Sequence, residues 1–138
     1  MKPPSLIFTL ILSVFLTSCG GTIHTYEGPE LPPEKVALVQ ESFLPFDLVT
    51  NASVRAVDDV WHDYTQKNAV VLPGEHAITI RLERCNPLWC THAYKSVTLN
   101  AEAGHIYIVN GKIIAYDNYF AWIVDKETGL IVAGAKPD

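Results

Sequence analysis

Cys85 and Cys90 are the residues whose type and spacing point most directly to chemistry, in the segment CNPLWC. Two cysteines this close in sequence can form a disulfide that closes a short loop. A redox-active pair normally has the spacing Cys-x-x-Cys at a helix N-terminus, which differs from this segment. A metal site is a further alternative, because two thiolates together with His92 or Glu83 supply ligands that zinc accepts. The spacing favours the disulfide and leaves the metal site as the alternative.

Aromatic side chains gather beside Asp and Asn in two segments, WHDY (61–64) and YDNYFAW (116–122). Aromatic rings next to carboxylate and amide groups can hold a glycan strand or a small ligand. The candidate contacts for such a ligand are Trp61, Tyr64 and Tyr119.

The competing interpretation is that most of these rings belong to the hydrophobic core. Strand alternation places Phe120 and Trp122 on one face, so we expect these two rings to pack the core. Tyr116 and Tyr119 would then line its rim. On this interpretation the segment 116–122 has a structural role and binds no ligand.

The elements that would position these residues are short strands separated by turns. The segment HAITIRLER alternates apolar and polar residues cleanly, with Ile78, Ile80 and Leu82 on one face. No segment shows a sustained helical period. Further strand candidates are 35–40, 53–57, 68–74, 93–101, 105–109, 112–116, 120–125 and 130–134. We predict an all-β fold, an antiparallel β-sandwich of about seven or eight strands.

Two hairpins follow from the same pattern. If strands 76–84 and 91–99 pair around the cysteine loop, Cys85 lies directly opposite Cys90 and Ile78 opposite Val97. Directly opposed residues have Cβ atoms ~4.5–5.5 Å apart, close to what a disulfide needs. The second hairpin is predicted at Asn110-Gly111, because both turn positions favour positive φ.

The N-terminus has the layout of a secretory signal: Lys2, then the apolar run LIFTLILSVFL, then small residues. The run is too short to span a membrane as a helix. It ends in LTSC, which resembles the bacterial lipobox. The resemblance implies that residues 1–18 are a cleaved lipoprotein signal peptide and that lipid is attached to Cys19. Gly20 follows in place of the Asp that retains lipoproteins in the inner membrane. The resemblance therefore implies the outer membrane of a Gram-negative bacterium, facing the periplasm. An ordinary secretory signal with Cys19 as a free thiol is the alternative.

Residues 19–34 contain several Gly and Pro and little apolar alternation, so we expect a flexible tether there and one folded domain over residues 35–138. The opening YEGPELPPEKVALV resembles that of small proteobacterial lipoproteins. The segments VRAVDD, LPGEHAITI and SVTLNAEAGHIYIV resemble the strand–turn pattern of PEGA-like β-domains, although Asp59 stands where those domains usually carry Gly. The resemblance implies a β-sandwich in the envelope and brings no catalytic residues.

Charge excludes some functions. The chain of 138 residues has a net charge of −5, and removing residues 1–18 takes away only Lys2, which leaves −6. This sign argues against nucleic-acid binding and against electrostatic docking on anionic lipid. In the oxidising envelope Cys85 and Cys90 remain as a pair once Cys19 carries lipid, which favours their disulfide.

No catalytic motif appears in the sequence. The scattered histidines, namely His24, His62, His76 and His105, show no ligand spacing and are expected at the surface or in turns. We therefore expect no enzyme, no cofactor and no metal, but a lipid-anchored protein that binds other envelope proteins. Binding of peptidoglycan, another carbohydrate or a small ligand is the alternative, and metal binding at Cys85, Cys90 and His92 a third.

Overall fold

The computed structural model describes residues 21–42 and 50–138, and this part of the chain is nearly all β. It contains ten strands and one short 3₁₀ helix, η1 (Pro33–Lys35). The strands are β1 (Gly21–His24), β2 (Ala37–Gln40), β3 (Asn51–Val57), β4 (Val60–Trp61), β5 (Gln66–Val71), β6 (Gly74–Cys85), β7 (Cys90–Ala101), β8 (Ile106–Ala115), β9 (Asn118–Asp125) and β10 (Ile131–Gly134).

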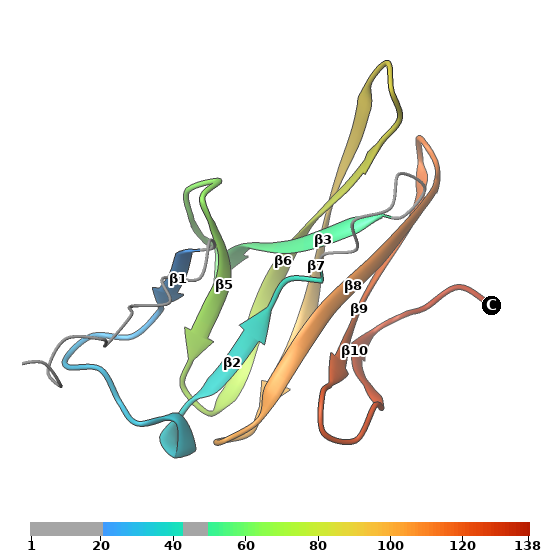
Figure 1. Cartoon of the computed structure of the whole chain (residues 1–138). Helices are drawn as coiled ribbons and strands as arrows, with labels where there is room; N and C mark the ends of the chain where they lie inside the picture. The colour runs from blue at the N-terminus through green and yellow to red at the C-terminus, as the bar shows by residue number, and fades with distance from the viewer. Residues whose placement is uncertain (1–20, 43–49) are drawn as a thin grey trace, which may run out of the picture.

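The strands form two sheets that pack face to face (Figure 1). The larger sheet has the order β1-β5-β2-β8-β9-β10, and the smaller has the order β4-β3-β6-β7. The predicted all-β sandwich is confirmed, with ten strands in place of seven or eight. The larger sheet is not wholly antiparallel, because β1 runs parallel to β5 and β2 runs parallel to β8.

The core lies between the sheets and is built by alternation. In β6, Ile78, Ile80 and Leu82 are fully buried, while the residues between them turn outward. Val109 of β8 and Ile123 of β9 close the core from the other sheet. Burial of such apolar side chains is the main source of stability in a sandwich of this kind.

The predicted pairing of β6 with β7 is confirmed over its whole length. Cys85 pairs with Cys90, and Ile78 pairs with Val97. The two strands form a long hairpin that projects beyond the rest of the smaller sheet (Figure 1).

The hairpin predicted at Asn110-Gly111 is wrong. Strand β8 runs straight through both residues, and the turn to β9 comes later, at Tyr116-Asp117. Gly111 does not have a positive φ. Its role is steric: a Cβ at this position would lie 2.0 Å from Cδ2 of Leu82 in the opposite sheet. A glycine required for close packing between sheets carries the same sequence signal as one required for a turn.

The tether expected over residues 19–34 is wrong from Gly21 onward. Gly21–His24 form β1, which adds to the edge of the larger sheet beside β5. Gly21 allows this close pairing, since a Cβ would lie 2.9 Å from the Gln66 side chain. Beyond β1, the Thr25 hydroxyl donates to the Val70 carbonyl at 3.0 Å, so the next residue is also held. Among the described residues the folded domain therefore already includes Gly21–His24 and does not start near residue 35.

The expected core role of Phe120 and Trp122 is also wrong. The two rings do share one face of β9, but it is the outer face, where both are half-buried. Ala121 and Ile123 face the core. Tyr119 packs against the edge of the core, in agreement with its predicted place at the rim.

Candidate functional site

Cys85 and Cys90 form the predicted disulfide, with their Sγ atoms 2.00 Å apart. Both sulfurs belong to the disulfide in this structure, so neither is placed as a thiolate beside His92. Nδ1 of His92 instead lies 3.1 Å from the Glu83 carboxylate. The disulfide joins the last residue of β6 to the first of β7 and closes the loop that carries Leu88 and Trp89.

The β6–β7 and β8–β9 hairpins project at the same end of the sandwich (Figure 1). Four large apolar residues at the ends of these hairpins are exposed, namely Leu88 (82 %), Trp89 (63 %), Ile114 (48 %) and Tyr116 (93 %). Trp89, Ile114 and Tyr116 line a groove of about 240 Å³, together with polar Arg84, Asn86 and Thr91. We call Leu88, Trp89, Ile114 and Tyr116 the tip surface.

The backbone beneath the tip surface is held in place. The Asn86 carboxamide oxygen accepts hydrogen bonds from the backbone N–H groups of Leu88 (2.8 Å) and Trp89 (2.9 Å). Arg84 donates to the Ile113 carbonyl at 3.1 Å and so links one hairpin to the other. The disulfide adds a covalent closure. A rigid apolar surface loses little conformational entropy when it binds a partner.

Strand β1 lies level with the first half of β8, away from the tip surface: Ile23 pairs with Ala69, Ala69 with Val39, and Val39 with Tyr107. Strand β1 is parallel to β5, β5 is antiparallel to β2, and β2 is parallel to β8. Hence β1 is antiparallel to β8, so the chain enters β1 from the side of the sheet toward which β8 runs. Cys19 lies outside the described residues.

A second candidate surface covers the outer face of the smaller sheet. Trp61 of β4 and Tyr94 of β7 meet edge to face, with ring centroids 5.8 Å apart. The exposed Tyr64 ring covers two guanidinium groups, those of Arg55 at 3.8 Å and Arg81 at 5.4 Å from its centroid. We call these five residues the aromatic–arginine surface.

The two arginines have different partners. Arg81 pairs with the Glu83 carboxylate at 2.6 Å. Arg55 is buried and donates to the His62 carbonyl. Within residues 21–42 and 50–138, Arg55 has no carboxylate within ion-pair distance, and its Nε has no hydrogen-bond partner. A hydrogen bond with Tyr94, followed by the positive charge of Arg55, lowers the pKa of Tyr64. The surface therefore combines exposed rings with two guanidinium groups, of which Arg55 is buried beside the Tyr64 ring and Arg81 is paired with Glu83.

Trp61 and Tyr64, two of the ligand contacts predicted from the sequence, are brought together here, but Tyr119 is not. It lies on β9 of the other sheet, where Nζ of Lys95 is 6.0 Å from its ring centroid. Tyr94, Arg55 and Arg81 were missed, because only the strand pairing brings them beside Trp61 and Tyr64.

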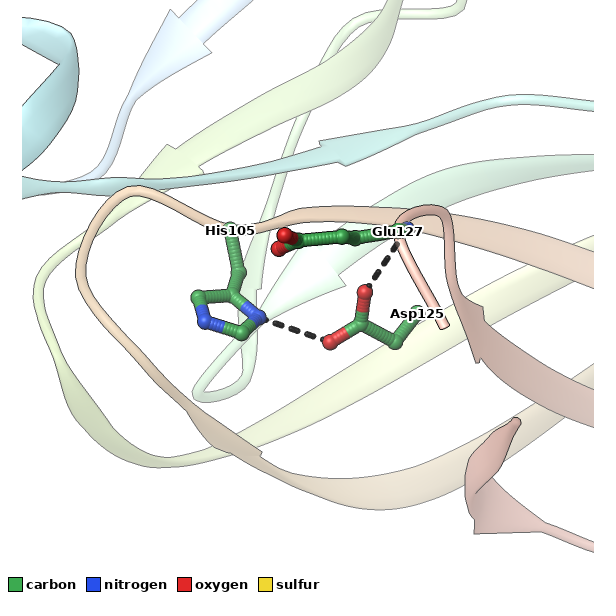
Figure 2. Close-up of side chains that lie close together, drawn as sticks. All are labelled: His105, Asp125 and Glu127. Carbon is green, nitrogen blue, oxygen red and sulfur yellow. Dashed lines mark hydrogen bonds and ion pairs between the residues drawn. The ribbon is translucent and has the colours of Figure 1, made fainter. Parts of the chain in front are cut away.

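The third feature is a charged cluster around His105 at the start of β8 (Figure 2). Nδ1 of His105 is 2.7 Å from the Asp125 carboxylate, and Nε2 is 3.3 Å from the Glu102 carboxylate. The hydrogen bond to Asp125 raises the pKa of His105 and lowers that of Asp125. Figure 2 shows the Glu127 carboxylate lying beside the same ring.

His105 was expected only as a surface or turn residue. Asp125 is 20 residues away in sequence and reaches His105 through the pairing of β8 with β9. Spacing along the chain therefore gave no signal for this cluster.

In residues 21–42 and 50–138, the structure contains no helix long and apolar enough to cross a membrane. No protein-family model, curated protein sequence or solved structure matches this chain.

Proposed function

We propose that this protein is a lipid-anchored protein of the outer membrane, facing the periplasm, and that it acts by binding another envelope protein through its tip surface. The observation that carries the proposal is the exposure of Leu88, Trp89, Ile114 and Tyr116 on two linked, rigid hairpins. Contiguous exposed apolar side chains of this size are characteristic of interaction sites. Trp and Tyr are also the residue types that dominate binding energy in protein interfaces.

The lipid anchor and the tip surface support each other. If lipid is attached to Cys19, only Gly20 separates it from β1, so the domain lies close to the bilayer. Because β1 is antiparallel to β8, the chain enters β1 from the side toward which the hairpin tips point, and this direction favours an orientation with the tip surface toward the membrane. A protein in or on the same membrane is the partner within reach.

The groove favours a protein partner over the bilayer itself. Its lining includes the polar side chains of Arg84, Asn86 and Thr91. These groups can be satisfied by the backbone or side chains of a protein, whereas lipid tails offer no hydrogen-bond partners. The net charge of −6 expected for the mature chain also disfavours an anionic membrane surface.

Site-specific photo-crosslinking in intact cells tests this function. A photoreactive residue replaces Tyr116 at the tip, or Glu75 at the opposite end of the sandwich as the control; both residues are exposed. We expect one defined protein adduct from position 116 and none from position 75. Adducts to lipid alone would mean that the tips contact the bilayer, and the same adducts from both positions would contradict a specific tip contact.

The aromatic–arginine surface supports a second candidate function, binding of a peptidoglycan or other glycan strand. Trp61, Tyr64 and Tyr94 come from separate strands or loops and converge beside Arg55 and Arg81. Exposed rings gathered in this way are suited to stacking on sugar rings. Co-sedimentation with purified sacculi tests this candidate. Binding that is lost in Trp61→Ala but kept in Trp89→Ala would favour it, and absence of co-sedimentation would contradict it.

A further inference from the structure

We propose that His105, Asp125 and Glu127 form a binding site for a divalent transition-metal ion such as Zn²⁺. One nitrogen of His105 and one carboxylate oxygen from each of the two acids lie within 4.8 Å of one another (Figure 2). An imidazole with carboxylates is a ligand set that zinc accepts.

Asp125 is positioned before any ion arrives. The residue is buried, and its Oδ1 accepts a hydrogen bond from the backbone N–H of Glu127 at 2.9 Å. This bond fixes the carboxylate and directs Oδ2 at Nδ1 of His105, 2.7 Å away. Asp125 thus presents Oδ2 to the site, while its Oδ1 accepts the hydrogen bond from the Glu127 N–H in the turn.

His105 is oriented from its other side. Its Nε2 faces the Glu102 carboxylate at 3.3 Å, and its ring stacks on Tyr107 with centroids 6.0 Å apart. Histidines that bind metal almost always donate their second N–H to a carboxylate or carbonyl, which fixes the tautomer. Glu102 takes this place through its ion-pair contact with Nε2, so we assign Glu102 as a positioning residue and Nδ1 as the nitrogen that binds the ion.

The charges around the ring also favour a cation. Three carboxylates, those of Glu102, Asp125 and Glu127, surround one imidazole. In the part of the chain that the structure describes, none of the three is within ion-pair distance of a lysine or arginine. A divalent ion that displaced the proton between Nδ1 and Oδ2 would compensate this negative charge.

Little rearrangement is needed. Zinc–ligand distances of about 2.0–2.2 Å place two ligand atoms of one tetrahedral ion about 3.4 Å apart. His105 and Asp125 need to separate slightly, and the Glu127 side chain needs to approach. Glu127 is exposed, so rotation of its side chain is sufficient, and the exposed side leaves room for water to complete the coordination.

The chain contains an internal control for this geometry. Nδ1 of His76 lies 2.7 Å from the Asp58 carboxylate, the same distance as in the His105–Asp125 pair. Its Nε2, however, faces the Leu72 carbonyl, and no third potential ligand joins the pair among the described residues. The described residues thus contain two histidine–aspartate pairs with the same distance, and of these two only the His105 pair has a third potential ligand beside it.

Calorimetric titration of Zn²⁺ into the full chain, solubilised in detergent and stripped with a chelator, tests the proposal. We expect the wild type to bind one equivalent in this site. Glu127→Gln and His105→Gln should weaken binding by about 10- to 100-fold, Glu102→Gln by about 10-fold, and His76→Gln not at all. Circular dichroism checks that each variant is folded, and Glu127→Gln changes only an exposed side chain.

Three results would overturn the proposal. The first is a wild type that binds no stoichiometric Zn²⁺. The second is Glu127→Gln binding as tightly as the wild type, and the third is His76→Gln weakening binding as much as His105→Gln. The second would remove Glu127 from the proposed ligand set, and the third would assign the ion to other surface histidines.

Discussion

Gly111 of β8 and Leu82 of β6 bring the two sheets into direct contact, because the Leu82 side chain packs against the backbone of Gly111. A Cβ on Gly111 would lie 2.0 Å from Cδ2 of Leu82 and 3.0 Å from the Phe120 carbonyl oxygen. Leu82 is fully buried in the core.

Gly111→Ala should therefore destabilise the protein by about 1–3 kcal/mol through overpacking. Chemical denaturation measures this loss. The matched test repeats Gly111→Ala in a Leu82→Ala background, where the added methyl meets a cavity and should cost much less. Equal losses in the two backgrounds would show that Leu82 is not what requires glycine.

Removal of the Cys85–Cys90 disulfide should lower stability by about 2 kcal/mol, since it closes a loop of only six residues. Cys85→Ser/Cys90→Ser compared with the oxidised wild type measures the effect in denaturant. Reductant should destabilise the wild type to the level of the variant and leave the variant unchanged. A reductant effect on the variant would place the cause outside this bond.

Asp58 should contribute to stability in a pH-dependent way. Burial acts to raise its pKa, but hydrogen bonds with His76 and the Ala77 N–H dominate and lower the pKa below the ordinary value of 3.8. A lowered folded-state pKa gives a contribution that is present above pH 3.8 and lost as pH falls through the folded value. Asp58→Asn should thus be less stable than wild type at pH 5, with the difference shrinking in acid.

The control for this prediction is Asp59→Asn, which removes the same charge from the same turn. Asp58 and Asp59 both have positive φ, of 50° and 65°, and Asn tolerates that conformation as well as Asp does. Thermal unfolding between pH 2 and pH 6 compares the three proteins. If Asp59→Asn loses stability with the same pH dependence as Asp58→Asn, the loss comes from removing a negative charge in the turn and not from the hydrogen bonds of Asp58.

The intact mass of the protein, extracted from membranes without reductant, should begin at Cys19. It should be raised by acyl groups and be two hydrogens short because of the disulfide. Cys19→Ser should remain unprocessed or appear without the acyl mass. A mature wild-type protein without lipid would mean that LTSC does not act as a lipobox, and the proposed orientation toward the membrane would then fail.

The sequence was sufficient where alternation decides the structure. Ile78, Ile80 and Leu82 alternate with polar residues, and this pattern predicted both the strand and its pairing with β7. The pairing in turn placed Cys85 opposite Cys90. Such predictions succeed because a shift of one residue in the pairing register would turn the whole apolar face of the strand into solvent.

The sequence was insufficient where distant contacts decide. Gly111 and the strand Gly21–His24 depend on Leu82 and β5, which local patterns do not reveal. The same limit applies to the candidate sites. Asp125 meets His105 through strand pairing, and Tyr94 meets Trp61 across the face of a sheet.

The most direct test of the proposed function is the affinity of the purified protein for the partner identified by crosslinking at position 116. The double variant Trp89→Ala/Tyr116→Ala removes two tip side chains, and Trp61→Ala/Tyr64→Ala removes two from the aromatic–arginine surface as the control. If the tip surface is the contact, the tip variant should bind at least about 100-fold more weakly, and the control should bind like the wild type. Unchanged affinity of the tip variant, or an equal loss in the control, would contradict the proposal.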